Sequence, residues 1–298
     1  MSGPGEIPCR PDGSGGPPAL SFCRMHITPV IAFADADAIP ASDAGCIGPV
    51  GADALAALAR ERIVVVLSSS RTRAQMESTR QALGIFHPFI AEAGAAAFVP
   101  DRYFSMELET TRKIGGYQAL EFCAPYEQVV ATVRRSADRL GIGIAGFSDM
   151  SVEQVARECG LSLLDARLAK LREYREPFRL LSPNPIAERR LLRALETAGV
   201  VCSRQGDFFV AGTGHGLHQA VNELSALYRR ALGGGLTASV VAGPDAGEYA
   251  RLVDFTLQPI PRDPGDTRPA RAWVLGLIDQ ISAVRGAQVH ARAARFAR

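Results

Sequence analysis

The sequence lacks the features that would place it among disulfide-rich, zinc-binding or membrane-spanning proteins. Its 298 residues include six cysteines, and no two of them form a CxxC pair. We therefore expect the reduced thiols of a cytoplasmic protein rather than a disulfide framework or a zinc site. No apolar run approaches the roughly 20 residues that a membrane-spanning helix needs. The cysteines are Cys9, Cys23, Cys46, Cys123, Cys159 and Cys202.

An excess of one charge is also missing. The chain has 33 Lys and Arg against 31 Asp and Glu, so its net charge of +2 gives no argument for a nucleic acid or an anionic membrane as partner. An apolar share of 47% is ordinary for a globular protein. Residues 1–24 differ from the rest, because this Gly- and Pro-rich stretch cannot bury a core. We expect a disordered leader there, and the sequence leaves the oligomeric state open.

Two carboxylates follow the first strongly apolar segment of the chain. The run from Val30 to Ala34 leads directly into Asp35 and Asp37, spaced i, i+2. A buried parallel strand reads as such a run, and open α/β sheets bind their ligands at the carboxyl ends of their strands. Two carboxylates at that edge favour a cation or a proton between them. The alternative is an acidic loop after a strand, without a function.

Apolar strand patterns and helical patterns alternate along much of the chain. Residues 63–67 form a second apolar run that ends in serines, and residues 239–242 form a third that leads to Asp245. Helical spacing follows the first two runs, at residues 51–62 and 73–83. This alternation predicts an α/β fold with a doubly wound parallel sheet.

The middle of the chain has a different pattern. Helical stretches at residues 125–140 and 185–198 are each followed by strand-like sequence, and a hairpin is expected to turn at Gln205–Gly206. Two short helices are expected after Ser151 and Ser162, which both have the form of a capping box. We therefore predict an α+β cap, residues 102–211, inserted into a core formed by residues 25–101 and 212–298.

In a doubly wound sheet the three strand ends should meet at one edge. They would bring together the carboxylates of Asp35, Asp37 and Asp245 and the hydroxyl groups of Ser69 and Ser70. Carboxylate oxygens suit Mg²⁺, and hydroxyl and backbone N–H groups can hold the oxygens of a phosphate. A carboxylate can also act as the nucleophile toward phosphorus. The sequence thus predicts a site for phosphate chemistry.

Five segments resemble motifs of the haloacid-dehalogenase (HAD) superfamily, and within it they are most similar to mannosyl-3-phosphoglycerate phosphatases. The resemblance extends over about residues 30–254 and is most specific in the cap. The segments are Phe33–Pro40, Ser69–Arg73, Pro88–Ala96, Gly146–Ala156 and Ala166–Phe178.

The resemblance implies a Mg²⁺-dependent phosphatase that acts on a small phosphorylated sugar or glycerate through an aspartyl-phosphate. Asp35 would be the nucleophile, and Asp37 would protonate the leaving oxygen and then activate water. The other roles that the resemblance implies are phosphate binding by Ser69 and Ser70, substrate binding by Lys170, Arg172 and Glu176 in the cap, and Mg²⁺ binding by Asp35, Asp37 and Asp245.

The chain departs from the family pattern around this site. Ala38 and Ile39 replace the Gly and Thr that follow the second aspartate, and residues 212–221 contain no lysine where the third motif has one. His215 or His218 could supply that positive charge if protonated. One electrostatic contact of this kind is worth on the order of 10²–10³ in rate. We therefore expect the missing motif residues to lower the catalytic rate.

The acidic fourth motif is reduced as well. Only Asp245 keeps its place, and the second carboxylate is missing or shifted to Glu248. The sequence thus supports two hypotheses, a phosphatase or a catalytically impaired protein of the same fold that binds a phosphorylated metabolite or a partner protein. The glycine run Gly212, Gly214 and Gly216 is expected to be a flexible hinge between cap and core rather than a nucleotide site.

Overall fold

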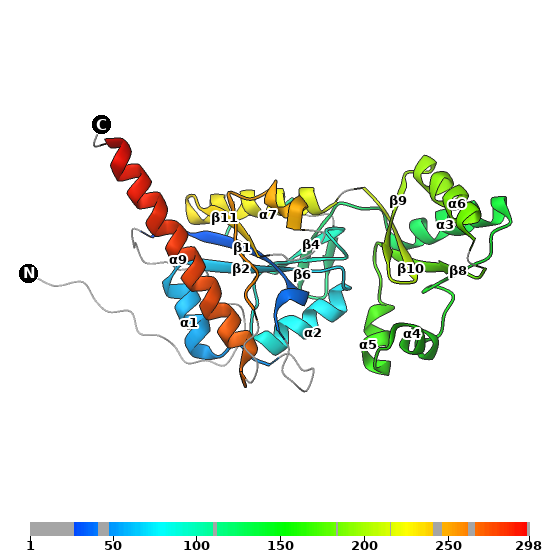
Figure 1. Cartoon of the computed structure of the whole chain (residues 1–298), viewed down its shortest axis with the longest axis horizontal. Coiled ribbons are helices and arrows are strands. Elements are labelled where there is room, and N and C mark those ends of the chain that lie inside the picture. The colour runs from blue at the N-terminus through cyan, green and yellow to red at the C-terminus, as the bar shows by residue number, and fades with distance from the viewer. Residues whose placement is uncertain are drawn as a thin grey trace, which may run out of the picture.

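The computed structural model divides the chain into a larger and a smaller α/β part that lie side by side (Figure 1). It describes residues 27–40, 48–109, 112–182, 184–214, 216–240, 246–261 and 266–296. The predicted leader at 1–24 lies outside these residues, as do Asp245 and His215. Within the described ranges, none of the helices combines the length and the apolar character that crossing a membrane requires.

The larger part is built on an eight-stranded sheet. The strand order is β12-β11-β1-β2-β3-β4-β6-β5, in which β12, β11, β1, β2 and β3 run parallel and β4, β6 and β5 are antiparallel. The strands are β1 (Val30–Asp35), β2 (Ile63–Ser68), β3 (Phe89–Ala91), β4 (Ala96–Pro100), β5 (Arg112–Ile114), β6 (Tyr117–Glu121), β11 (Leu236–Val240) and β12 (Phe255–Thr256).

Helices cover both faces of this sheet. Leu58 of α1, Met76 of α2 and Trp273 of α9 belong to one apolar core, and Leu224 of α7 belongs to the other. Figure 1 shows α7 above the sheet and α1 and α2 below it. The helices are α1 (Ala52–Arg60), α2 (Arg73–Leu83), α7 (Gly216–Leu232), α8 (Ala246–Ala250) and α9 (Pro269–Phe296). The predicted doubly wound α/β fold is confirmed.

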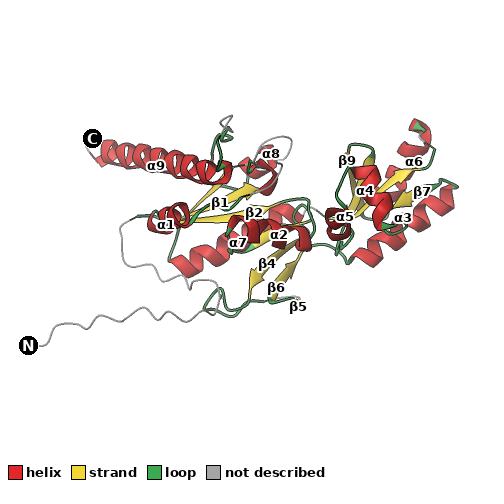
Figure 2. Cartoon of the chain, turned by 90° about the horizontal axis from the view of Figure 1, so that it is seen from below, coloured by secondary structure: helices red, strands yellow, loops and turns green. Residues whose placement is uncertain are grey.

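The smaller part is an α+β unit on a four-stranded antiparallel sheet of order β7-β8-β10-β9. Its helices α3 and α6 pack on one face, and α4 and α5 pack on the other (Figure 2). Its elements are α3 (Tyr126–Leu140), β7 (Ile144–Gly146), α4 (Val152–Cys159), α5 (Leu163–Ala169), β8 (Glu176–Leu180), α6 (Pro185–Thr197), β9 (Val200–Gln205) and β10 (Phe208–Thr213).

Two details of the prediction need correction. The cap was predicted to begin at residue 102, but β5 and β6 are hydrogen-bonded to β4 and extend the larger sheet to residue 121. The β9–β10 hairpin turns at Gly206–Asp207, one residue later than predicted, because Gln205 already pairs with Phe208. The capping box at Ser151 is confirmed, and the Ser162 hydroxyl accepts from the N–H of Asp165.

Candidate functional site

Asp35 and Asp37 lie where the central strand of the larger sheet ends. The five residues before Asp35 are completely buried, since β1 pairs with β2 and β11 and is covered on both faces. Asp35 then starts a short 3-10 helix, η1 (Ala36–Ala38), by accepting a 2.9 Å hydrogen bond from the backbone N–H of Asp37. This turn brings both carboxylates to the carboxyl edge of the sheet.

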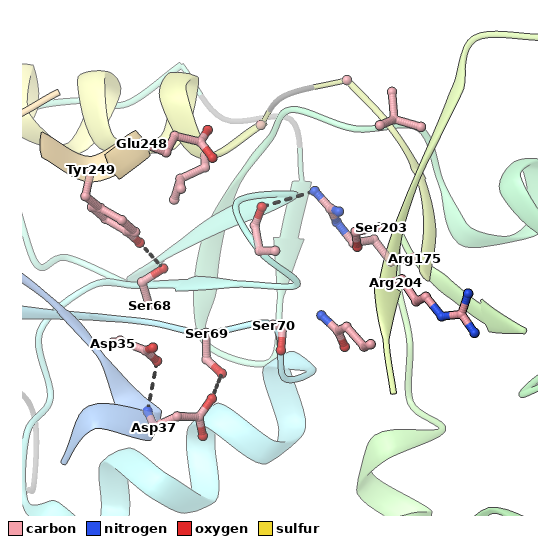
Figure 3. A pocket seen from close by; sticks show the side chains of 16 residues that line it. Asp35, Asp37, Ser68, Ser69, Ser70, Arg175, Ser203, Arg204, Glu248 and Tyr249 are labelled. Atoms are coloured by element: carbon pink, nitrogen blue, oxygen red, sulfur yellow. Dashed lines mark hydrogen bonds between the residues drawn. The ribbon is translucent and has the colours of Figure 1, made fainter. Parts of the chain in front are cut away.

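The serines after β2 lie beside these aspartates. The Ser69 hydroxyl donates to Asp37 Oδ2 at 3.3 Å and accepts from the backbone N–H of Arg71 at 3.1 Å. Arg71 also forms an ion pair with Asp37. Ser68, in contrast, accepts a 2.5 Å hydrogen bond from the buried Tyr249 hydroxyl of α8 (Figure 3). The structure thus brings together the predicted nucleophile, the second aspartate and Ser69.

A pocket of about 430 Å³ opens over these residues. Its volume is within the range of small-molecule sites, roughly 300–1,000 Å³. The core contributes Asp35, Asp37, the three serines 68–70, Ala93, Glu248 and Tyr249, and the cap side contributes Arg175, Val201, Ser203, Arg204 and Gln205. Figure 3 shows the serines and aspartates opposite Arg175 and Ser203. Both parts of the protein therefore form the site.

The three cap residues predicted to bind substrate do not line this pocket. The Lys170 ammonium donates to the backbone carbonyls of Phe147 and Met150, inside the cap. Arg172 donates to the Ser70 carbonyl at 3.0 Å. Glu176 is buried inside the cap. The prediction placed these three side chains in the substrate site, whereas in the structure they hold the cap together and attach it to the core.

Glu176 is only 2% exposed. Its carboxylate accepts from the hydroxyls of Tyr126 at 2.5 Å and Ser148 at 2.6 Å, and from the Ser148 N–H at 3.1 Å. Burial raises the pKa of Glu176, although these hydrogen bonds act in the opposite direction. A carboxylate with this many internal partners is a structural group of the cap.

A tight turn at residues 92–94 contacts residues 173–175, where the cap comes back to touch the core between α5 and β8. Glu92, Ala93 and Gly94 have φ values of 47°, 52° and 90°. The Glu92 side chain, 1% exposed, accepts from the backbone N–H groups of residues 173, 174 and 175 at 2.7, 3.3 and 2.8 Å. Burial raises the pKa of Glu92, while Arg172 and the three N–H groups act against that rise. We call residues 173–175 the return segment.

Gly94 also has a steric reason to be glycine. A Cβ at this position would lie 2.1 Å from the backbone nitrogen of Leu217, in the first turn of α7. A Cβ on Gly216 would in turn lie 2.2 Å from the Gly94 carbonyl oxygen. The predicted hinge role of the glycine run therefore does not account for Gly216, whose missing side chain allows two backbones to touch.

Arg175 and the β9 residues of the pocket were not among the predicted site residues. Arg175 donates to the carbonyl of Ala93 at 3.1 Å. Val201, Ser203 and Gln205 are alternate residues of β9, and alternate residues of a strand point to the same face. The two-residue periodicity of the predicted hairpin could therefore have grouped these three residues on one face of the cap.

The oxygen donors of the site fit the preference of Mg²⁺, but their arrangement fits it only in part. Asp35, Asp37 and Glu248 line the same pocket. The Asp37 carboxylate is ion-paired with Arg71. Among the described side chains, no three His, Cys, Asp or Glu residues cluster as a metal site. Asp245, the third predicted ligand, lies outside the described residues. His218 is exposed, shares a 3.0 Å hydrogen bond with Asn222 and is not among the residues that line the pocket.

Comparison with curated proteins finds sequence relatives of one kind. A glucosyl-3-phosphoglycerate/mannosyl-3-phosphoglycerate phosphatase of Methanococcoides burtonii is 33% identical over 177 residues, 59% of this chain and 65% of that protein. A phosphatase with the same name from Persephonella marina is 29% identical over 185 residues, 61% of this chain and 67% of that protein. The chain thus matches only about two thirds of the length of these relatives. No protein-family model matches it.

Comparison with solved structures identifies the fold. A phosphatase of the haloalkanoate (HAD) enzyme superfamily from Bacteroides thetaiotaomicron aligns over 87% of this chain and 98% of its own, with a TM-score of 0.53 and 12% identity. A haloacid dehalogenase-like hydrolase from the same organism aligns over 85% and 99%, with a TM-score of 0.52 and 12% identity. At this identity the likeness concerns the fold alone, and it includes both parts of the chain.

Proposed function

We propose that the chain is a phosphatase of the haloacid-dehalogenase superfamily that releases phosphate from a small phosphorylated sugar or glycerate, because its sequence relatives and its fold are of that kind. The observation that carries the proposal is the meeting of Asp35, Asp37 and Ser69 in one pocket, with Ser69 Oγ 3.3 Å from Asp37. The names of the sequence relatives favour glucosyl- or mannosyl-3-phosphoglycerate as the substrate.

In this proposal the Asp35 carboxylate attacks phosphorus and the bond between phosphorus and the substrate oxygen breaks. The leaving oxygen takes a proton that Asp37 relays, and an aspartyl-phosphate forms. Water then attacks its phosphorus, Asp37 accepts a proton from that water, and phosphate leaves as the Asp35 carboxylate is restored. Ser69 and Ser70 hold oxygens of the transferred group.

Mg²⁺ is part of the proposal as the cofactor. Asp35 and Asp245 would hold it, whereas the Asp37 side chain is engaged by Arg71. When bound, the ion would offset the negative charge that Asp35 and the phosphate bring together. The proposed partner is therefore a small phosphorylated molecule, and the charge balance of the chain gives no support for nucleic acid.

The test is phosphate release from mannosyl-3-phosphoglycerate, glucosyl-3-phosphoglycerate and a panel of sugar phosphates in the presence of Mg²⁺. Wild-type turnover should fall by at least about 10³-fold in Asp35→Asn, which removes the nucleophile. Turnover that persists in this variant would mean that a contaminant or a different group performs the reaction.

A second candidate function is supported by the Asp37–Arg71 ion pair. This pair occupies the side chain that has to exchange protons in the phosphatase mechanism. A protein that binds a phosphorylated metabolite without hydrolysing it would need no such exchange. Saturable binding of the same compounds, with no phosphate release from any of them, would select this function.

A further inference from the structure

The core side of the candidate site contains more negative than positive charge before a substrate enters. The carboxylates of Asp35, Asp37 and Glu248 line the pocket, and the ion pair with Arg71 balances one of them. A phosphate monoester adds about −1.5 to −2 charges at neutral pH. Binding it therefore requires a further cation that can form charge-assisted hydrogen bonds with its oxygens.

Arg175 has the position for this task. Its backbone N–H is bound to Glu92 at 2.8 Å, and its Nη2 donates to the Ala93 carbonyl at 3.1 Å. Within the part of the chain that the structure describes, no carboxylate forms an ion pair with its guanidinium, and its buried Nε has no hydrogen-bond partner. Its positive charge and several of its N–H donors thus remain available inside the pocket.

The Arg175 side chain passes Gly212, which has no side chain of its own to obstruct it. Gly212 of β10 lies directly beside the Arg175 stem, and a Cβ on Gly212 would be 3.0 Å from Arg175 Cγ. A larger residue would push the stem from its place. The backbone clamp, the Ala93 contact and the space at Gly212 together direct the guanidinium from the cap side toward the core side of the pocket (Figure 3).

The other arginines near the pocket are engaged elsewhere. Arg204 is ion-paired with Glu188 at 3.3 Å, and its guanidinium lies over the Phe209 ring at 5.3 Å from the centroid. Figure 3 shows its guanidinium directed away from the aspartates. Arg172 donates to the carbonyls of Ser70 and Ala169 and does not line the pocket.

We propose that Arg175 is the phosphate-binding cation of this pocket, and that it contacts the oxygens of the phosphate monoester that Asp35 attacks. This proposal rests on the proposed function for its substrate class. Because a guanidinium can bind two phosphate oxygens at once, it also fixes the orientation of the phosphoryl group. The cap thereby contributes a charge that the core of this chain does not supply.

The test compares Arg175→Gln with Arg175→Lys. Glutamine keeps a donor for the Ala93 carbonyl but loses the charge, whereas lysine keeps the charge. Binding of inorganic phosphate, measured by calorimetry, should weaken by about 10- to 100-fold in Arg175→Gln, as expected for a lost charge-assisted hydrogen bond. In Arg175→Lys it should weaken by less than about 10-fold. Turnover, where the wild type has it, should fall on the order of 10²-fold in Arg175→Gln.

Arg190→Ala is the matched control, because Arg190 is an exposed arginine of α6 in the same cap, and it should bind phosphate like the wild type. Phosphate binding that is unchanged in Arg175→Gln overturns the proposal even if the wild type is an active phosphatase. An equal loss in Arg175→Lys and Arg175→Gln, with the same melting temperature as the wild type, also overturns it. A wild type that binds phosphate through Arg175 but hydrolyses no substrate supports this proposal and contradicts the proposed phosphatase function.

Discussion

Replacing Glu92 by glutamine should weaken the attachment of the cap to the core. Glu92 Oε1 accepts from the N–H of residue 173, and Oε2 accepts from those of residues 174 and 175. Glutamine has one carboxamide oxygen, so it can keep the two bonds at the Oε2 position. Its NH₂ group then faces the N–H of Glu173, and two donors meet in a position that is 1% exposed.

The magnitude follows from this loss. A hydrogen bond to a charged group contributes about 1.5–3 kcal/mol, and a buried donor without a partner costs about 1–3 kcal/mol. Since the two estimates partly describe the same N–H, we expect Glu92→Gln to lower the free energy of unfolding by about 2–4 kcal/mol. That is a large part of the roughly 5–15 kcal/mol that stabilises a typical domain.

Urea denaturation monitored by circular dichroism measures this change. Glu223→Gln is the control, because Glu223 is an exposed residue in the middle of α7, and its effect should stay within about 0.5 kcal/mol. Hydrogen exchange should also become faster at the amides of the return segment in Glu92→Gln. A loss below about 1 kcal/mol, with unchanged exchange at residues 173–175, would refute the role of Glu92 as the clamp.

Two further predictions concern stability. Gly94→Ala should cost more than about 3 kcal/mol or prevent folding, because its Cβ would lie 2.1 Å from the Leu217 backbone nitrogen at a φ of 90°; a melting temperature equal to that of the wild type would contradict this. Burial and the neighbouring Arg80 lower the pKa of His87 to about 4 from 6.5. Because the unfolded chain binds this proton more tightly, the free energy of unfolding should fall by about 1.4 kcal/mol per pH unit as the pH is lowered from 6.5 toward 4. His87→Gln should lack this part of the pH dependence, and parallel curves for the two proteins would show that His87 does not titrate in this range.

The parallel half of the sheet could be predicted from sequence because its strands are buried on both faces. Residues 30–34 and 63–67 are all 0–2% exposed, and such strands appear in a sequence as continuous apolar runs. Asp35 and Ser69 could be predicted for the same reason, since each lies where an apolar run stops. The antiparallel strands β5 and β6 have no continuous buried run: β5 has two exposed residues, and β6 has two buried residues among half-buried ones. No comparable signal therefore placed them in the larger sheet.

The cap residues of the site could not be placed in this way. Motif resemblance selects a segment, but it does not say which side of the segment faces the pocket. Successive side chains of extended backbone point to opposite sides, so Glu176 points into the cap core while Arg175, its neighbour, lines the pocket. The prediction named Glu176, whereas its neighbour Arg175 is the residue of this segment that lines the pocket.

The turn at residues 92–94 has a consequence for exchanging domains between proteins of this fold. Its carboxylate binds the return segment, its Ala93 carbonyl holds Arg175, and its Gly94 touches the start of α7. A chimaera that transplants only the cap of a relative would join a foreign return segment to a turn shaped for this one. The transferable module is therefore discontinuous, and a graft should take residues 92–94 and Gly216 along with the cap.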